Sequence, residues 1–411
     1  MRIVIYSYNY HPEPIGIAPL MTELAEGLVQ RGHQVRVITG MPNYPQRQIY
    51  SEYRGKFYLV ENLHQVKVQR SYVWVRSDPG LIDRILLDGS FVVSSLPQAF
   101  NGWRPDLVFA TVPPLPVCVP ATLLRWLYRC PLVLNVQDIL PDGAIQVGLL
   151  KNSFLIWVFR TLEKFAYRHA SKIAVIADGF TDNLLNKQVP AQKLVQIPNW
   201  VDINFIRPLP KAESSFRREN ELQGKFVVLY SGNIALTQGL ETVVAAAGQL
   251  QDLPDLQFAI VGEAQALETL KQQYQPGGNV LLRPFQPREK LPDMLAAADV
   301  GLVVQKRNIS FNMPSKIPVI LASGRAIVAS VSANGSAAQA VRRSNGGLVV
   351  EPENPDALAA ALRELYGDRE KTAFLGRQGR EYAVQQYSFQ SSLNQYEALF
   401  SQLVPHPQDS Q

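Results

Sequence analysis

The stretch Val227-Val-Leu-Tyr-Ser231, continued by Gly232-Asn-Ile-Ala-Leu-Thr-Gln-Gly239, carries the pattern that decides the fold. Its first part is a short β-branched and apolar run, which predicts a buried strand, and a helical pattern follows the second glycine. Two glycines in a strand-to-helix loop allow backbone N–H groups to approach an anion closely. The stretch predicts a strand-loop-helix unit of a parallel sheet, and makes Gly232, Asn233, Gln238 and Gly239 candidate binding residues.

The same alternation of short apolar runs and longer helical patterns continues along the chain, which is typical of α/β proteins with parallel sheets. In the second half we expect strands at 226–231, 257–261, 280–282, 300–304, 326–330 and 347–350. In the first half we expect them at 2–7, 35–39, 66–70, 107–111, 132–136, 173–177 and 194–197. Each set predicts one doubly wound, Rossmann-like sheet.

The length of 411 residues suits two domains of about 200 residues each. We place the first domain at residues 1–200 and the second at 201–385, with prolines between 198 and 224 marking a linker. A helical pattern from about 369 to 402 closes the chain; its last part, 386–402, can cross back to the first domain, and 403–411 is predicted to be a flexible tail. Two such domains are expected to face a central cleft beyond the carboxyl ends of their strands.

The composition favours a cytoplasmic protein. The N-terminus lacks the features of a signal peptide, and no run of about 18 uncharged apolar residues occurs. The two cysteines, Cys118 and Cys130, stand in apolar surroundings, which predicts buried free thiols.

The net charge of +5 is distributed unevenly. Residues 1–200 hold 20 Lys and Arg against 14 Asp and Glu, whereas residues 201–411 hold 20 against 21. This excess predicts a membrane-facing or nucleic-acid-facing surface in the first half. No basic cluster is interleaved with exposed-looking aromatic residues and no known nucleic-acid-binding motif is present, so nucleic acid is disfavoured as a partner.

The segment Asn312-Met-Pro-Ser-Lys316, which opens a predicted helix, is the most informative part of the second half. Ser315 and Lys316 offer a hydroxyl group, an ammonium group and backbone donors to one diphosphate. A solvated lysine in a first helical turn is the alternative. Gly262 and Glu263 end another strand, near the place expected for a nucleotide base.

No Asp-x-Asp triplet occurs, so the usual carboxylate clamp for a metal-bridged nucleotide sugar is missing. We therefore expect metal-independent chemistry with no cofactor. Lys316 and helix N-termini would then neutralise the leaving diphosphate.

The first half carries its own candidates in loops that follow strands. His11 and Gly16 belong to the loop after the first strand, where a plain turn and a histidine bonded to the backbone are the alternatives. Asp138 follows the strand 132–136 and is placed to hydrogen-bond sugar hydroxyl groups. Asp142 is the second choice there, with a helix N-cap as its alternative.

A basic face is expected on the helical segment 154–172. Its cations recur every four residues beside Phe154 and Trp157 and neighbouring apolar residues, and they are Arg160, Lys164, Arg168 and Lys172. The segment 123–129 has a similar pattern. Basic faces flanked by Trp and Leu suit an anionic bilayer surface, although amphipathic helices packed on a sheet are the alternative.

Taken together, these motifs resemble the retaining glycosyltransferases of family 4, and more narrowly the WcaI-type enzymes of colanic acid and other exopolysaccharide pathways. The resemblance runs from residue 2 to about 395 and is carried by His11-Pro-Glu-Pro with Gly16, Gln137-Asp138 with Pro141, Ile197-Pro-Asn-Trp-Val-Asp202, Ser231-Gly-Asn-Ile, Gln238-Gly239, Pro314-Ser-Lys316 and Ala322-Ser-Gly324. It implies a GT-B fold with a nucleotide-diphosphate sugar in the second domain and an acceptor over the first. The loop with Gln137 and Asp138 corresponds to an acceptor-side position in many relatives.

The chain departs from the family pattern at positions that matter for donor binding. Many members carry two glutamates eight positions apart, and here these positions hold Phe311 and Val319. The Arg and Lys often found after the Gly232-type glycine are Asn233 and Gln238. We infer that Lys316 substitutes for them as the cation that binds the diphosphate.

We therefore expect a retaining glycosyltransferase that elongates a lipid-linked saccharide at the inner membrane surface, in exopolysaccharide or lipopolysaccharide biosynthesis. The absent glutamates motivate a second hypothesis, a non-catalytic subunit that binds a nucleotide sugar. A nucleotide-sugar isomerase would need an acid/base cluster that the sequence lacks.

Overall fold

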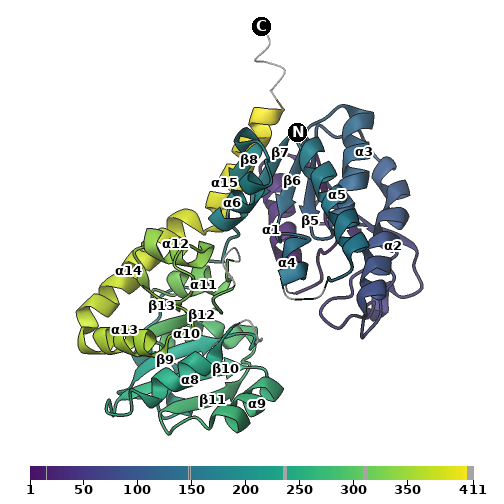
Figure 1. Cartoon of the computed structure of the whole chain (residues 1–411). Coiled ribbons are helices and arrows are strands. Elements are labelled where there is room, and N and C mark those ends of the chain that lie inside the picture. Colours follow the sequence, from purple (N-terminus) through teal and green to yellow (C-terminus); the bar gives the residue numbers. More distant parts are fainter. Residues whose placement is uncertain (15, 147, 149, 235–237, 309–312, 405–411) are drawn as a thin grey trace. The chain divides into compact units, whose positions relative to one another are not determined.

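The computed structural model describes the chain except for residues 15, 147, 149, 235–237, 309–312 and 405–411. It divides into two compact units, each built around its own sheet (Figure 1). The first unit comprises residues 1–176, 180–199 and the chain from Leu393 onward, and the second comprises 177–179 and 200–392.

The first unit holds an eight-stranded sheet with the order β3-β4-β2-β1-β5-β6-β7-β8. All neighbours pair in parallel except β3 and β4, which are antiparallel. Helices cover both faces, so the central strands are apolar and buried along their length. The strands are β1 (Arg2–Tyr6), β2 (Gln34–Gly40), β3 (Tyr58–Leu63), β4 (Val66–Ser71), β5 (Leu107–Val112), β6 (Leu132–Val136), β7 (Lys172–Val175) and β8 (Leu194–Gln196).

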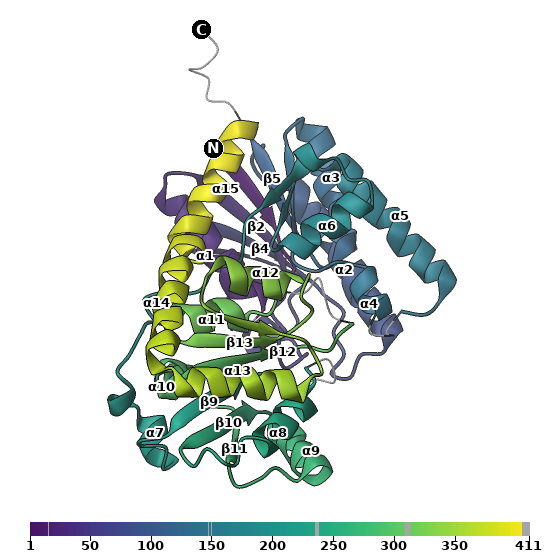
Figure 2. The ribbon, with the colours of Figure 1, turned by 60° about the vertical axis from the view of Figure 1, so that its left-hand side comes forward.

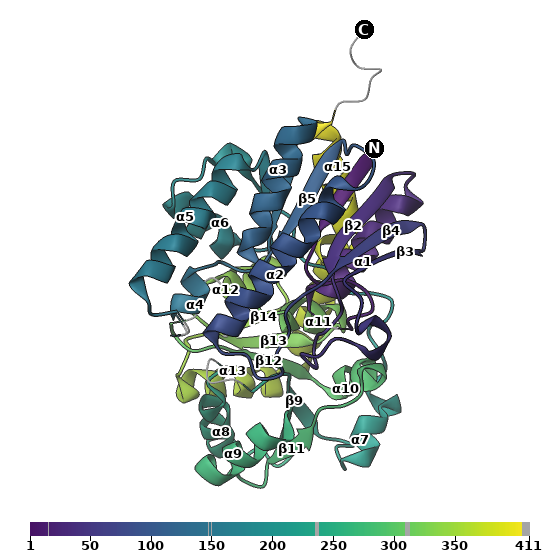
Figure 3. The same cartoon turned by 90° about the vertical axis from the view of Figure 1, so that its right-hand side faces the viewer.

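Two groups of helices enclose this sheet. Phe109 of β5 contacts the rings of Tyr396 and Phe400, and Thr111 donates to the Met21 sulfur, so α1 and α15 share one face. Helices α2, α3 and α5 lie side by side over the other face (Figure 3). The helices named here and the others of the first half are α1 (Ile17–Gln30), α2 (Leu81–Phe100), α3 (Cys118–Tyr128), α4 (Asp142–Gln146), α5 (Ser153–His169), α6 (Asp178–Asn186) and, at the end of the chain, α15 (Phe389–Leu403).

The second unit holds a six-stranded, fully parallel sheet with the order β11-β10-β9-β12-β13-β14. Its strands are β9 (Phe226–Ser231), β10 (Leu256–Gly262), β11 (Val280–Pro284), β12 (Val300–Val304), β13 (Ala326–Ser330) and β14 (Gly347–Val350). Its helices are α7 (Ser215–Glu219), α8 (Leu240–Gly248), α9 (Ala264–Tyr274), α10 (Leu291–Ala297), α11 (Lys316–Ala322), α12 (Ser336–Arg343), α13 (Pro355–Gly367) and α14 (Arg369–Gln386).

Two hydrophobic cores lie on opposite faces of the second sheet. Val227 and Leu229 of β9 face the core that α10, α11 and α12 complete, whereas Val228 and Tyr230 face the core of α8, α9 and α13. This alternation follows from the two-residue period of a strand. Figure 2 shows α13 and α14, which both contact β13.

Each predicted strand is present within two or three residues of its expected bounds, and the expectation of two parallel α/β sheets is confirmed. Strand β3 was not predicted. It is an antiparallel edge strand whose residues are alternately exposed and half-buried, so it lacks the continuous apolar run of the other strands.

The structure refines three other expectations. The helical pattern 369–402 consists of two helices, α14 and α15, and the Tyr387 carbonyl after α14 accepts a hydrogen bond from the Val201 N–H. In the segment 198–224, where prolines mark the expected linker, Ile206 and Phe216 are buried in the second unit's core. Lys172 does not continue the helical basic face, because α5 ends at His169 and Lys172 begins β7.

Cys118 and Cys130 are buried free thiols, as expected. In the described part of the chain, no helix combines the length and apolarity needed to cross a bilayer. Within the same residues, no group of three or more His, Cys, Asp and Glu side chains is arranged to hold a metal ion.

Candidate functional site

A cavity of about 380 Å³ lies in the second unit, beyond the end of β9 and beside the start of α11. Five residues proposed from the sequence line it, and they are Gly232, Asn233, Gln238, Ser315 and Lys316. They come from two loops about 80 positions apart in the chain. The parallel sheet brings both loops to the carboxyl ends of neighbouring strands, where α/β proteins bind ligands.

Lys316 is the most unusual side chain of this cavity. Its Nζ atom is shielded from solvent and has no hydrogen-bond partner among the described residues. It lies 3.7 Å from the centroid of the Tyr230 ring, an arrangement in which the ring face attracts a cation. Burial lowers the pKa of the Lys316 ammonium to about 7. A buried cation without an anionic partner is costly, so the site is suited to a ligand that supplies negative charge.

Gly232 makes room for this ammonium group. Its φ is +138°, in a region that side chains rarely adopt, and a Cβ atom there would lie 2.5 Å from Lys316 Cε. The Tyr230 hydroxyl donates to the Asn233 carbonyl at 2.7 Å, which fixes the loop that follows β9. Gly232, Tyr230 and Lys316 therefore form one packed arrangement.

The remaining donor-side candidates lie outside the residues that line the cavity. Gly239 is the residue before α8 and is left-handed, with φ +66°. A Cβ atom on Gly262 would collide with Ile234, so this glycine is required by packing. Glu263 is exposed at the start of α9. The structure thus gives Gly239 and Gly262 conformational and packing roles.

In the first unit, Gln137 belongs to a network of amides rather than to an open site. Its Nε2 donates to Asn135 Oδ1 at 2.6 Å and to Asn199 Oδ1 at 3.0 Å, and its Oε1 accepts from Asn199 at 2.7 Å. Asn135 in turn donates to the buried Tyr396 hydroxyl at 2.6 Å. These bonds occupy the Gln137 amide and position the loop that carries Asp138.

Asp138 comes directly after Gln137 in the chain and is exposed overall, although its carboxylate is partly shielded. Crowding and burial around its carboxylate raise its pKa, while the Ile139 N–H, which donates to Oδ1 at 2.9 Å, opposes the rise. Asp138 lies two residues after the end of β6, and its sugar-binding role stays a prediction.

His11 and Gly16 lie in the loop between β1 and α1. The His11 backbone donates to Thr22 Oγ1 and accepts from Arg70, and the pKa of its ring is lowered, chiefly by burial and then by Arg70. Gly16 precedes α1 with φ +72°, which favours glycine.

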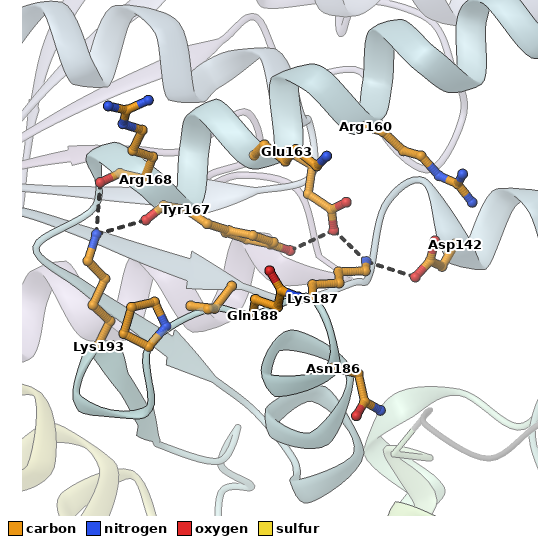
Figure 4. Close-up of a pocket in the computed structure, with 12 residues that line it drawn as sticks. Asp142, Arg160, Glu163, Tyr167, Arg168, Asn186, Lys187, Gln188 and Lys193 are labelled. Atoms are coloured by element: carbon orange, nitrogen blue, oxygen red, sulfur yellow. Dashed lines mark hydrogen bonds and ion pairs between the residues drawn. The ribbon is translucent and has the colours of Figure 1, made fainter.

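Asp142 begins α4 and forms part of a second pocket, of about 730 Å³, shown in Figure 4. The Lys187 ammonium bridges Asp142 Oδ2 at 2.7 Å and Glu163 Oε1 at 2.6 Å, and Tyr167 donates to the same Glu163 oxygen. Although burial acts in the opposite direction, Lys187 and Asn183 hold the pKa of Asp142 below its usual value. Asp142 is thus engaged within the protein.

The rim of this second pocket is basic. Arg160, Lys164 and Arg168 line it and are exposed along α5. In Figure 4, Arg160 and Arg168 stand at opposite ends of the pocket. Phe154 and Trp157 are 66% and 62% exposed on the same helix. Arg125, by contrast, donates to the His169 carbonyl and to Ser171, so its guanidinium group closes the end of α5.

Comparisons with known proteins agree with this geometry. Residues 16–200 match the family model "Glycosyl transferase 4-like domain", and residues 212–382 match "Glycosyl transferases group 1". The chain is 34% identical to a protein of Escherichia coli (strain K12) provisionally assigned as the colanic acid biosynthesis glycosyl transferase WcaI, over 96% of this chain and 98% of the relative. The chain belongs to the glycosyl transferase 4-like family.

Solved structures show the same fold. The sucrose-phosphate synthase of Thermosynechococcus elongatus superimposes with a TM-score of 0.74 at 19% identity, over 98% of this chain and 99% of the other. HepE of Anabaena, solved in complex with UDP, gives a TM-score of 0.72 at 18% identity, over 98% and 100%. This glycosyltransferase therefore has the two-domain α/β fold of GT-B enzymes.

Within this glycosyltransferase, Val319 lines the cavity at a position where the resemblance expects a glutamate. An apolar side chain there cannot accept hydrogen bonds from a ribose. The other expected glutamate position, Phe311, lies outside the described residues.

Two residues of this glycosyltransferase escaped the sequence reasoning. Arg325 lines the cavity; its pKa is lowered by burial, its Nη2 donates to the Leu209 carbonyl at 2.6 Å, and its Nε has no partner among the described residues. Glu13 is 4% exposed and accepts from Asn9 at 2.6 Å and from the N–H groups of Asn43 and Tyr44 at 2.8 and 2.9 Å. Glu13 belongs to the motif His11-Pro-Glu-Pro, but only its burial in the structure shows its role. Arg325 directly follows Gly324, and this position after α11 is the feature of the sequence that could have identified it.

Proposed function

We propose that this glycosyltransferase moves a sugar from a nucleotide-diphosphate sugar to a lipid-linked saccharide, with retention of anomeric configuration and without a metal ion. The observation that carries the donor assignment is the shielded Lys316 ammonium, which faces a cavity lined by Ser315 and Asn233 and lacks a described anionic partner. A diphosphate would supply the missing charge. Stabilising it as it leaves would promote transfer, because charge on that group grows toward the transition state.

The relatives support a role in cell-surface polysaccharide synthesis. The Escherichia coli relative is assigned to colanic acid biosynthesis, and HepE was solved with UDP bound. We accordingly place this enzyme in exopolysaccharide or lipopolysaccharide biosynthesis. Asp138, at the end of β6, would orient the acceptor or the transferred sugar.

A membrane-surface location is the second part of the proposal. Apolar side chains are exposed on α2, α3 and α5, which lie side by side, and they include Ile82 at 73%, Val93 at 69%, Trp126 at 53% and Leu127 at 60%. Arg160, Lys164 and Arg168 add positive charge at α5. Apolar and basic side chains together favour binding to an anionic bilayer, where lipid-linked acceptors reside.

The donor assignment is tested by incubating the protein with UDP- and GDP-sugars and measuring release of the nucleotide diphosphate, with and without lipid-linked acceptors. Lys316→Ala should lower both donor affinity and turnover, whereas Lys271→Ala, an exposed lysine of α9, should change neither. Unchanged kinetics in Lys316→Ala would refute the diphosphate role. Donor binding without release under any pairing would favour a non-catalytic binding subunit, for which Val319 is the motivating observation.

A further inference from the structure

A third pocket, of about 490 Å³, lies in the first unit beyond the carboxyl ends of β2 and β4. Its walls are the segments 47–49 and 72–77 together with Arg54. Since β2 and β4 are adjacent parallel strands, both segments leave the sheet at the edge where α/β proteins bind ligands. We name it the arginine pocket after Arg47, Arg54 and Arg76.

The residues that line the arginine pocket carry a net positive charge. Three of its ten lining residues are arginines and none is acidic. Arg54 uses its Nε to bond the Ile49 carbonyl at 3.0 Å. The only carboxylate near Arg76 among the described residues is Asp83, at 3.9 Å, and the Arg76 side chain is 62% exposed. Most of the guanidinium N–H groups therefore remain free for a ligand.

An aromatic surface stands beside these cations. Trp74 is 38% exposed, and the Arg76 guanidinium lies 5.4 Å from the centroid of its ring. Tyr72 is stacked on Phe57, with ring centroids 5.3 Å apart and planes inclined by 6°. An aromatic ring offers an apolar face on which the C–H face of a sugar can pack.

The segment is held in place by α2 and by the neighbouring loops. Ser90 accepts from the Trp74 N–H at 2.8 Å, and Ser94 donates to the Tyr72 carbonyl at 2.6 Å. Glu13 ties the loop after β1 to the loop after β2, which leads into Arg47. The pocket is therefore supported by α2 and by the loop after β1, which also carries His11.

We propose that the arginine pocket binds an anionic group of the acceptor saccharide, with Trp74 against a sugar ring. Guanidinium forks match carboxylate and phosphate oxygens in the same way, so either a uronate or a sugar phosphate satisfies this chemistry. The acceptor role rests on the proposed function, whereas anion binding by the pocket does not.

The test uses the full-length chain and three matched probes: methyl glucuronide, glucose 1-phosphate and the neutral methyl glucoside. Dissociation constants are measured by ligand-observed NMR at low and high salt. At least one anionic probe should bind about tenfold more tightly than the neutral one at low salt, and this preference should shrink at high salt. Preference for the glucuronide assigns a carboxylate and preference for the phosphate assigns a phosphate; equal preference supports the shared chemistry.

Replacing Arg47, Arg54 and Arg76 together by Gln should abolish the preference for anionic probes. Trp74→Ala should weaken the binding of all three probes by a similar factor. Arg84→Gln, an exposed arginine of α2 outside the pocket, should change nothing. Circular dichroism melting of each variant checks that it folds. Equal affinity for neutral and anionic probes, no binding of either anionic probe, or an equal loss in Arg84→Gln would overturn the proposal.

Binding of UDP and GDP is measured on the same variants. The triple glutamine variant should keep wild-type nucleotide affinity, because the donor cavity lies in the other unit. If the wild-type chain binds neither UDP nor GDP, the proposed donor is refuted, but the proposal that the arginine pocket binds anions is not. The two proposals therefore fail separately.

Discussion

At the scale of single residues, Lys316 is proposed to bind the donor but lowers the stability of the protein when the cavity is empty. Burial lowers the pKa of its ammonium to about 7, so in the empty cavity the charged form destabilises the fold at and below neutral pH. A pKa difference of one unit corresponds to about 1.4 kcal/mol. Lys316→Met should therefore raise the free energy of unfolding by about 1 to 2 kcal/mol at pH 6. The gain is smaller than the full pKa shift implies, because Met recovers only part of the cost of burying the ammonium group.

The gain should shrink as the pH rises from 7 and be small at pH 10.5, because the lysine is then neutral in the folded chain and half neutral in the unfolded chain. Urea unfolding at both pH values measures it. Nucleotide diphosphate affinity should be lost in the same variant. A variant that is destabilised at pH 6 would show that Lys316 is not a strained cation.

The same pKa predicts how donor binding depends on pH. If the diphosphate binds the charged ammonium, its affinity should fall by up to about tenfold for each pH unit above 7, because one proton must be taken up. Calorimetric titration of UDP or GDP between pH 7 and 9 measures the slope. Lys316→Arg, which stays charged, should flatten the profile even if its affinity is lower.

Glu13 illustrates what a sequence conceals at this scale. Its motif was visible, but nothing in the pattern shows that one carboxylate accepts from three donors in two loops. Glu13→Gln replaces an acceptor oxygen by a donor and should destabilise the chain by about 1 to 3 kcal/mol in urea unfolding. Glu52→Gln, an exposed glutamate nearby, should stay within about 0.5 kcal/mol. Equal effects would deny Glu13 its structural role.

At the scale of elements, the strands could be predicted because parallel strands covered on both faces are short, continuous apolar runs. The carboxyl ends of those strands then pointed to Ser315, Lys316 and Gly232, which line one cavity. What escaped prediction depends on long-range contacts. The edge strand β3 pairs with β4 alone among the described strands, and α14 ends next to Tyr387, whose carbonyl accepts a hydrogen bond from the Val201 N–H.

Helix α5 carries the element-scale prediction. Its exposed Phe154 and Trp157 lie on the same helix as Arg160, Lys164 and Arg168, which suits an anionic bilayer surface. A basic residue near such a surface contributes about 1 kcal/mol. Replacing the three cations by Gln should weaken partitioning to phosphatidylserine vesicles by about 100-fold in a flotation assay. Neutral vesicles or high salt should abolish the difference, and salt-independent binding would contradict it.

At the scale of the whole molecule, the alternation of strand and helix patterns was enough to predict two sheets, and the segment 386–402 was expected to be able to cross back to the first domain. The packing of the proline-marked segment 198–224 was not predicted, because its buried residues Ile206 and Phe216 form no regular apolar pattern. Helical periodicity shows that the last helix has an apolar face but not which sheet that face covers. That choice is made by contacts with residues far away in the chain, such as Phe109.

The last helix should therefore control the stability of the first unit in particular. Tyr396 and Phe400 of α15 are 1% and 0% exposed and pack against Phe109, and Glu397 pairs with Arg31. Phe400→Ala leaves a cavity and should cost about 3 to 5 kcal/mol. Because α15 is joined to the first sheet, hydrogen exchange should accelerate in β5 and β6 and stay unchanged in β9 and β12. Phe374→Ala, a 45% exposed phenylalanine of α14, serves as the control and should leave both sheets protected. Equal acceleration in both sheets would mean that the two units unfold as one.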